Sequence, residues 1–452
     1  MNIKLNFWGY NTEYQDIISN LRSVVFKTLT IFFIIAVIGL QANAQKSISK
    51  AIEQANKELW GKFIDEYGII RDFVGETPTP EDCDLGRPNA MGWWSPIENG
   101  PFFTGLYLTA ACERARRSGS KIDREKAIQL ADGLLRCSSV SDVTGFIVRG
   151  FGTDGQCHYP LGSVDQTIPW YLGLYSYLMS DIPSTEHRQL VMNKMREVTS
   201  ALLTLDWKLP CDGHFKGEFR GDLKSKNYLE VTTYLFVLRM MYQLFKEPVW
   251  LEQYRTALFE HPRGSVEQPS ASHKTRIEIC AAGYRIDSVI FKGRNIDKSA
   301  LWIYVKNQAT LFHIIAMEDD ETIKANYRTG LIKNAQNAFE AIGEYKKFDN
   351  NDTKVFGHAN WREGYPIWFT QETQADAERL SRMGDKAKLG DRKSYERTFM
   401  TNPLAAAAII AMAGDNANRE FIEQVISHYD YSKLNLSEFF FAEVAYYALS
   451  GK

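Results

Sequence analysis

The sequence has little of what marks several common classes of protein. Its 452 residues include only six cysteines, and no two of them form a C-x-x-C pair, so we predict no structural zinc site. No H-E-x-x-H, G-x-x-x-x-G-K-[ST] or G-x-S-x-G pattern occurs in the chain. Zincin metalloproteases, P-loop nucleotide hydrolases and α/β-hydrolases with a nucleophile elbow therefore have no support in the sequence.

An excess of charge of either sign is also missing. The formal net charge is -2 at pH 7 and the isoelectric point is near 6.5. Because nucleic-acid-binding proteins need basic surface to displace counterions, we predict no nucleic-acid partner. Aromatic residues, by contrast, make up 13% of the chain, which suits both core packing and stacking against sugars.

The longest apolar run is too short to cross a membrane. It reads TLTIFFIIAVIGL and ends at Leu40, whereas a spanning helix needs about 20 apolar residues. Arg22 and Lys27 precede it, and the small residues Ala42 and Ala44 follow it at the spacing of a cleavage site. This order is typical of a secretory signal peptide.

We therefore expect residues 1–44 to be removed and residues 45–452 to be exported to the periplasm or the cell exterior. No stable membrane span is expected after cleavage. A retained membrane anchor is the alternative. The polar stretch Met1–Ser23 is long for a signal peptide, and initiation near Val24 would give a more ordinary one.

Apolar residues then recur with a period near 3.6 rather than 2, which predicts helices. The expected helices are Ser47–Tyr67, Pro101–Ser118, Asp123–Arg136, Gln166–Ser180, Ser184–Leu205, Tyr228–Phe245, Pro248–Glu260, Ile277–Val289, Asp297–Met317, Asp320–Lys346, Pro403–Met412, Ala417–His428 and Ser437–Leu449. Each has one apolar stripe to bury, and no Pro/Gly/Ser-rich linker divides residues 45–452.

We predict a single all-α domain, an (α/α)6 toroid of helical hairpins whose inner helices direct their N-terminal ends toward a common cleft. A stacked helical-repeat solenoid is the alternative, but its repeats usually share a consensus that this chain lacks. Four expected connections are much longer than the roughly two to eight residues usual between packed helices, and such loops are often functional. They are Arg71–Gly100, Cys137–Asp165, Asp206–Asn227 and Phe348–Gln371.

The segment Gly145–Trp170 contains the first group of candidate residues. Alternating apolar residues and the turn Thr153-Asp154-Gly155 predict a short β-hairpin on the cleft side. Asp165 then opens the next helix, either as a general acid or base facing the cleft or as a first-turn acid stabilised by the helix dipole. The residues expected on the same side of the ring are Arg149, His158, Tyr159 and Trp170.

A second group precedes the helix at Pro101. Glu98 and Asn99 stand where an inner helix would meet the cleft, and the adjacent Trp93 and Trp94 are possible stacking platforms for a sugar. Glu98 and Asp165 would be the two carboxylates that cleavage of a glycosidic bond usually requires.

This order of residues resembles the six-hairpin glycosidases, nearest in style the unsaturated glucuronyl and unsaturated rhamnogalacturonyl hydrolases. In that group an Asp before an Asn-containing inner helix and another Asp near the next aromatic helix frame the uronic acid. Here Ile97-Glu98-Asn99-Gly100 stands at the first place, with Glu for Asp, and Gly162-Ser163-Val164-Asp165-Gln166 at the second. The usual W-x-R-G-Q-x-W pattern is absent, and Gln166 and Trp170 match it only in part. The likeness covers Trp93 to Tyr177.

The resemblance implies a glycoside hydrolase of uronic-acid-containing oligosaccharides that uses no cofactor and no metal. Asp165 and Glu98 would be catalytic, together with His158, and Asn99, Tyr159, Gln166 and Trp170 would bind substrate. Arg149 would bind the substrate carboxylate through paired hydrogen bonds, although an Arg in a hairpin is about as often a surface ion-pair partner.

Two later loops complete the expected cleft. His214 lies in a turn-rich stretch and either points inward or belongs to a surface turn. His358, Trp361 and Arg362 form a polar and aromatic group that we expect to contact substrate. No spacing fixes two of the histidines together, so they do not predict a metal site.

Two other functions stay open at this stage. A polysaccharide lyase or epimerase on the same toroid would use Tyr159 with His158 or His214 as base and Arg149 to neutralise the carboxylate. A non-catalytic glycan-binding protein would need aromatic residues without paired acids. The sequence leaves the sugar, the linkage, the stereochemical outcome and the oligomeric state undetermined.

Overall fold

The computed structural model describes residues 48–264, 269–284, 301–384, 389–414 and 418–450. The chain divides into two units, Met1–Lys50 and Ala51–Lys452, and nearly all described residues belong to the second. Helices dominate that unit, so the predicted all-α class is confirmed. The predicted signal peptide lies outside the described residues. Among the residues that are described, no helix is both long and apolar enough to cross a membrane.

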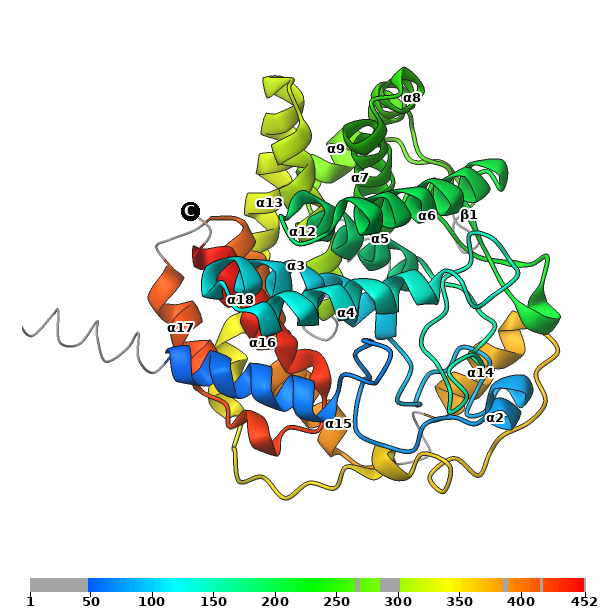
Figure 1. The fold of residues 1–452 in the computed structure, drawn as a ribbon, viewed down its shortest axis with the longest axis vertical. Coiled ribbons are helices and arrows are strands. Elements are labelled where there is room, and N and C mark those ends of the chain that lie inside the picture. Colours follow the sequence, from blue (N-terminus) through cyan, green and yellow to red (C-terminus); the bar gives the residue numbers. More distant parts are fainter. Residues whose placement is uncertain (1–47, 265–268, 285–300, 385–388, 415–417, 451–452) are drawn as a thin grey trace, which may run out of the picture. The chain divides into compact units, whose positions relative to one another are not determined.

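Twelve helices of the described residues correspond to predicted ones, and most of their ends agree to within a few residues (Figure 1). They are α3 (Gly100–Ser118), α4 (Lys121–Cys137), α5 (Val164–Met179), α6 (Thr185–Thr204), α7 (Tyr228–Phe245), α8 (Pro248–Phe259), α9 (Arg276–Ala282), α12 (Leu301–Met317), α13 (Glu321–Ile342), α16 (Asn402–Met412), α17 (Arg419–Ser427) and α18 (Phe441–Ser450). Three further helices, α2 (Pro80–Leu85), α14 (Gln374–Gly384) and α15 (Arg392–Glu396), were not expected from the periodicity.

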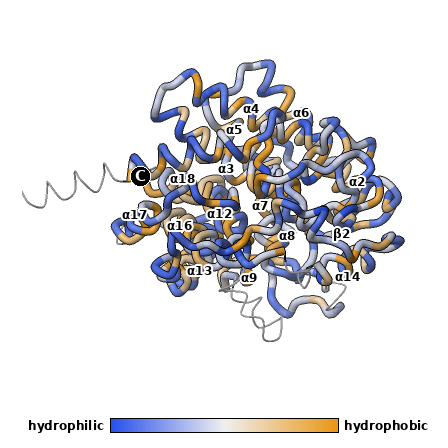
Figure 2. The backbone as a smooth tube through the Cα atoms, turned by 90° about the horizontal axis from the view of Figure 1, so that it is seen from below, coloured by the Kyte–Doolittle hydropathy of each residue, from blue (hydrophilic) through white to orange (hydrophobic). Residues whose placement is uncertain are grey.

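Six helices contact one another in a closed sequence. Helix α3 packs on α5, α5 on α7, α7 on α12, α12 on α16, α16 on α18, and α18 again on α3. These helices are buried over most of their surface, and every residue of α16 is buried. Figure 2 colours the backbone by the hydropathy of each residue. A helix that is apolar on all sides requires neighbours on all sides.

A second set of helices packs outside individual members of the first. Helix α4 contacts α3 and α5, α6 contacts α5, α8 and α9 contact α7, α13 contacts α12 and α16, and α17 contacts α16 and α18. These helices are amphipathic. In α6, for example, only one stripe is buried, consisting of Val191, Met195, Val198, Thr199 and Leu202.

Two predicted helices are shorter in the structure for local reasons. The first is helical only to residue 62, because the Asp65 carboxylate then accepts hydrogen bonds from the backbone N–H groups of Tyr67 and Ile69 and turns the chain. Helix α9 ends at Ala282 because Gly283 follows with a φ of 80°. Residues 285–289, the end of the predicted helix, lie outside the described residues.

The predicted β-hairpin between Gly145 and Pro160 is wrong. This segment contains no strand, because its backbone pairs with other parts of the chain: the Val148 N–H donates to Cys137 O, and the Thr153 N–H donates to Pro78 O. The two antiparallel strands in the described part of the chain are β1 (Lys208–Pro210) and β2 (Phe219–Asp222), in the next long loop. Gly150, Gly152 and Gly155 have the spacing of the dinucleotide-binding motif G-x-G-x-x-G. That motif connects a strand to a helix, whereas this segment follows no strand.

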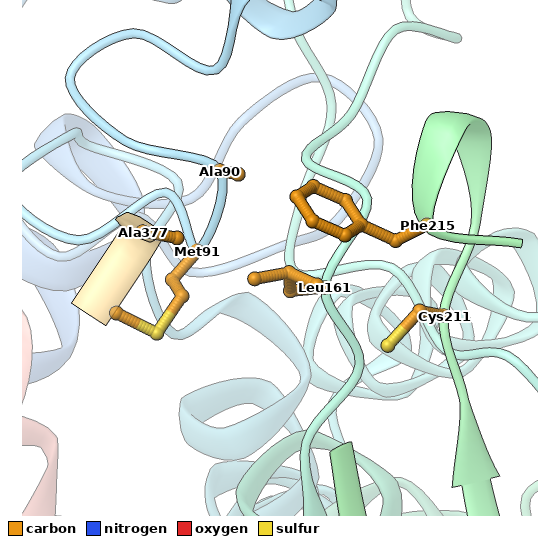
Figure 3. Close-up of a cluster of buried hydrophobic side chains, with 6 residues drawn as sticks. All are labelled: Ala90, Met91, Leu161, Cys211, Phe215 and Ala377. Atoms are coloured by element: carbon orange, nitrogen blue, oxygen red, sulfur yellow. The ribbon is translucent and has the colours of Figure 1, made fainter. Parts of the chain in front are cut away.

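The long loops share a small hydrophobic core of their own. Figure 3 shows its six buried side chains, which come from three of the four predicted loops and from α14: Ala90, Met91, Leu161, Cys211, Phe215 and Ala377. Trp93 packs against this core. The loops therefore hold one another in place beside the starts of α3 and α5.

Candidate functional site

The strongest candidate site is a group of buried or half-buried charged side chains beside the N-terminal ends of several helices. We call this group the charged cluster. Its members are Asp72, Glu98, Arg149, Asp165, Lys306, Lys393, Arg397 and Glu438.

The start of α3 is fixed by a very close approach of two backbone segments. The Gly100 N–H donates to Arg149 O at 2.9 Å, and a Cβ on Gly100 would lie 2.4 Å from that oxygen. Only glycine fits at this distance. The contact places Glu98 and Arg149 side by side, and the Arg149 Nη1 donates to the Glu98 carbonyl at 3.0 Å.

Asn99 is held by a network of buried polar groups. Its backbone N–H and its Nδ2 each donate to the Asp72 carboxylate at 2.7 Å, and its Oδ1 accepts from Gln166 Nε2 at 3.3 Å. Gln166 Oε1 in turn accepts from the Phe102 N–H. Asn99 and Gln166 were predicted to bind substrate; here they join the starts of α3 and α5 and hold Asp72 in place.

Glu98 is a buried carboxylate stabilised as an anion. Burial alone would raise its pKa, but the charges of Lys393 and Arg397 lower the pKa of Glu98 to about 2. Its Oε2 lies 3.5 Å from the Lys393 Nζ and accepts a hydrogen bond from the backbone N–H of Trp94 at 3.1 Å. Glu98 is therefore ionised at neutral pH and can act as a base or nucleophile.

Asp72 and Glu438 behave in the opposite way. Burial raises the pKa of Asp72, and the negative charge of Glu98 raises it further. Burial also raises the pKa of Glu438, whose Oε1 accepts from the Arg397 Nε at 3.2 Å. The cluster thus places carboxyl groups that resist ionisation beside one that is readily ionised.

Asp165 lies in the first turn of α5, as predicted, and Ser163 is the residue that caps the helix. The Ser163 side chain accepts from the Asp165 N–H at 3.1 Å. The Asp165 carboxylate forms an ion pair with the buried Lys306, and its side chain is 37% exposed. Although burial opposes ionisation, Lys306 and Arg149 keep the pKa of Asp165 below its usual range.

Arg149 is the charge common to both predicted catalytic carboxylates, since it lowers the pKa of Glu98 and of Asp165. Its own pKa is lowered to about 10 by burial and by the neighbouring Arg220. The Arg149 side chain is buried, so it is not a surface ion-pair partner. Glu98, Arg149 and Asp165 therefore belong to one electrostatic unit.

The cluster has four basic side chains and four carboxyl groups. Burial raises the pKa of two of those carboxyl groups, Asp72 and Glu438, and lowers the pKa of Lys393. Lys306, Lys393, Arg149 and Arg397 surround Glu98 and Asp165, and Arg220 adds a further positive charge near Asp165. Two of these cations lie against aromatic rings: Lys393 is 4.4 Å from the Trp94 ring centroid and Arg397 is 4.9 Å from that of Trp302. This arrangement suits an anionic ligand.

Two further predicted residues border the cluster. Trp94 is half-buried, and its Nε1 donates to Ser381 O at 3.1 Å. The buried His358 ring lies 5.5 Å from the Trp94 ring, and burial together with the charge of Lys393 lowers the pKa of His358 to about 2. His358 is therefore neutral at all ordinary pH values.

The hydrogen-bond and ring contacts of the other predicted histidines are with residues outside the charged cluster. The His158 Nε2 lies 2.7 Å from the Asp212 carboxylate and its Nδ1 lies 2.7 Å from Gln156 O, so both ring nitrogens are engaged. His214 is exposed and stacks on Phe215, as expected of a surface turn.

The remaining predicted aromatic residues belong to the core. Tyr159 and Trp170 are fully buried, and their side chains donate to the carbonyls of Arg87 and Leu134. Trp361 is buried and its Nε1 donates to Glu76 O at 2.8 Å. None of these rings presents a face to a sugar.

Arg362 has a structural partner as well. Its guanidinium binds the carboxylates of Glu76 and Asp82, which lie just before and within α2. Arg362 therefore links the loop that contains α2 to its own loop, Phe348–Gln371.

Reasoning from the sequence missed several members of the cluster. Lys306 had the clearest signal, since it interrupts the apolar run of α12. Asp72, Lys393 and Arg397 had none, because each stands among other charged residues in the sequence. Their place in the cluster follows only from charged side chains that are far from them in the sequence and close to them in space.

One cavity lies elsewhere in the described residues. It has a volume of about 540 Å³ and is lined mainly by apolar residues from α3, α5, α12, α16 and α18 toward their C-terminal ends. Its ionisable groups are Glu113 and Arg116, which bind each other, and His313, whose pKa burial lowers to about 4. It includes no member of the charged cluster, so its volume gives no support to carboxylate chemistry.

The described residues include no group of three or more His, Cys, Asp or Glu side chains that could hold a metal ion. Comparisons of the chain with protein-family models, with curated proteins and with solved structures find no match.

Proposed function

We propose that this chain is an exported glycoside hydrolase of uronic-acid-containing oligosaccharides. One observation supports the proposal above the others: the carboxylates of Glu98 and Asp165, which come from the starts of different helices, both interact electrostatically with the buried Arg149, whose Nη1 also donates to the Glu98 carbonyl. Two carboxylates beside a guanidinium can serve the reacting bond and the carboxylate of an acidic sugar.

We further propose that the helices form an (α/α)6 toroid. The closed circuit of contacts through α3, α5, α7, α12, α16 and α18 supports this arrangement, as does the second set of amphipathic helices outside it. In such a ring the inner helices would start at one end, where the positive ends of their dipoles favour an anionic ligand.

The neighbouring charges favour Glu98 as the base and Asp165 as the acid. Glu98 stays ionised beside Lys393 and would activate water as a base. Asp165 is ionised in the free protein, because Lys306 neutralises it. A substrate carboxylate bound to Arg149 would offset the positive charge that also lowers the pKa of Asp165, raise that pKa and let Asp165 act as the acid.

A second candidate function is non-catalytic binding of an acidic glycan. The observation in its favour is that the pKa values of both Glu98 and Asp165 are lowered in the free protein, so neither is a ready proton donor. Binding needs only the cations of the cluster. The lyase reading has less support, since Tyr159 and His158 both have other partners.

The test is activity of the purified protein on a panel of glucuronide and unsaturated-uronide oligosaccharides. Asp165→Asn and Glu98→Gln should each lower kcat by at least about 100-fold, as expected for the loss of an acid or base. Asp132→Asn is the matched control, because Asp132 is a carboxylate that pairs with His187 outside the cluster; this variant should keep full activity.

Three results would contradict the proposed glycoside hydrolase activity or the role of its two carboxylates. Turnover that survives both cluster substitutions would remove Glu98 and Asp165 from the chemistry. New absorbance of unsaturated uronide from saturated chains would establish a lyase. Binding of acidic glycans without turnover, measured by calorimetry, would favour the non-catalytic function.

A further inference from the structure

Two cysteines far apart in the sequence lie on segments that meet in the fold. Cys83 lies in α2, and Cys157 lies in the loop between α4 and α5. The neighbouring Cys157 and burial raise the pKa of the Cys83 thiol. The other four cysteines, Cys112, Cys137, Cys211 and Cys280, are buried in other elements.

The backbone around Cys157 is built to place its sulfur there. The Gly152 N–H donates to Cys157 O at 2.8 Å, and the Asp154 carboxylate accepts from the Cys157 N–H at 2.8 Å. A Cβ on Gly152 would lie only 2.1 Å from the Cys157 Sγ, so the sulfur occupies space that any other residue would fill.

A second contact brings the two segments together independently of the thiols. The Thr153 N–H donates to Pro78 O at 2.9 Å, two residues before α2 begins. The two segments therefore approach each other as backbone. The same point, a Cβ built on Gly152, would lie 2.1 Å from the Cys157 Sγ and 2.5 Å from Pro78 O, so this sulfur faces the segment that leads into α2. Close approach of the two segments is what a disulfide needs if it is to form without large movement of the chain.

We propose that Cys83 and Cys157 form a disulfide when the protein meets a disulfide oxidant, either oxidised glutathione or an oxidised thiol oxidoreductase. The two sulfurs join and their two hydrogens leave as protons. The pair of electrons passes to the oxidant, whose disulfide becomes two thiols. Within a cell this inference rests on the proposed export, because exported proteins meet such oxidants; the chemistry of the pair does not depend on glycosidase activity.

The surroundings set the order of the two steps. Cys157 is half-exposed, whereas Cys83 is buried. The Cys157 thiolate attacks the oxidant and forms a mixed disulfide. Cys83 then loses its proton and attacks the Cys157 sulfur, which releases the reduced half of the oxidant. The neighbouring Cys157 and burial both raise the pKa of Cys83, so the second step is the slow one and accelerates as pH rises.

The bond would join the two loops that supply the candidate site. Helix α2 precedes Glu98 on one loop, and Cys157 lies between Arg149 and Asp165 on the other. Arg362 already fastens α2 through Asp82. The disulfide therefore restrains the loops from a second side and limits how far Glu98 and Asp165 can separate.

The experiment begins with the full chain, reduced and then equilibrated with a buffer of reduced and oxidised glutathione. Free thiols are alkylated under denaturing conditions without reductant, and peptides are mapped by mass spectrometry. We expect one cross-linked peptide that joins Cys83 to Cys157 and alkylation of the other four cysteines. The oxidised protein should melt about 2–8 °C above the reduced one.

Variants separate this bond from nonspecific oxidation. Cys83→Ser should leave glutathione attached to Cys157, because the resolving thiol is gone, and Cys157→Ser should abolish both the link and the adduct. Cys112→Ser, a buried thiol in α3, is the control and should keep the link. Alkylation of both Cys83 and Cys157 in the fully folded oxidised protein would overturn the inference, even if hydrolysis is observed. Formation of the link in a protein that cleaves no glycan would leave the inference standing and the proposed function refuted.

Discussion

At the scale of single residues, two chemically similar carboxyl groups have pKa values that are shifted in opposite directions. Glu98 and Glu443 are both buried, yet the pKa of Glu98 falls to about 2 and that of Glu443 rises to about 7. The difference lies in their partners. Burial favours the neutral form in both, but Lys393 and Arg397 outweigh it only at Glu98.

Glu98→Gln should destabilise the protein at pH 7. The folded-state pKa of Glu98 is below its unfolded value, so its contribution is present above pH 4.5 and is lost as pH falls toward 2. The shift corresponds to about 3 kcal/mol at neutral pH. Urea unfolding of both proteins between pH 3 and 7 measures it, and a stability difference that does not shrink on acidification would contradict the assigned charge state.

Glu443→Gln should show the opposite pH dependence. Burial raises the pKa of Glu443 to about 7, although Arg114, Asn56 and Tyr107 partly offset the effect. Because the folded-state pKa lies above the unfolded value, native Glu443 costs stability progressively as pH rises from 4.5 to about 7, by up to about 3 kcal/mol. The glutamine variant should lose this dependence. Equal slopes of unfolding free energy against pH in the two proteins would refute the prediction.

At the scale of elements, the starts of the helices decide where chemistry can occur. Local signals set these starts: Pro101 lies at the first turn of α3, and Ser163 caps α5. Such signals act within a few residues, so the sequence predicts them. The loop from Gly145 to Pro160 was mispredicted because its backbone bonds go to Pro78 and Cys137, which are distant in sequence.

Gly100→Ala tests the junction between α3 and the loop that contains Arg149. The added Cβ would lie 2.4 Å from Arg149 O and 2.5 Å from the Ile69 Cγ2, so one of the segments must move. We expect a loss of about 1–3 kcal/mol in unfolding free energy and a raised pKa of Glu98 as Arg149 withdraws.

Gly61→Ala is the matched control for that substitution. Gly61 is helical and its Cβ would meet no atom within 4 Å, so the change should be neutral or stabilising by up to about 1 kcal/mol. Thermal denaturation of both variants gives the comparison. A Gly100→Ala protein as stable as the control would mean that the close approach does not constrain the junction.

At the scale of the whole unit, the last described helix completes the set of helix contacts. Helix α18 packs on both α3 and α16, and Phe440, Phe441 and Ala445 are fully buried. Helix α18 therefore covers both α3 and α16, which are far apart in the sequence.

Removal of residues 441–452 should abolish cooperative unfolding, because α3 and α16 would each expose an apolar face. Calorimetry of the truncated chain is the measurement. Phe441→Ala, a milder change, should cost about 3–5 kcal/mol, whereas Phe259→Ala at an exposed position in α8 should cost little. A truncated chain that unfolds with the native enthalpy would show that the helices are stable without closure.

The sequence by itself determined the helical class and the positions of Glu98 and Asp165 at helix starts. Periodicity and capping act over one or two turns, so they can be read from neighbouring residues. Only the tertiary structure decided which charges neutralise these acids. Lys306 is 141 positions from Asp165, and Lys393 is 295 positions from Glu98. Electrostatic pairing depends on distance in space, and a single sequence carries no record of which distant charges the packing of helices will bring together.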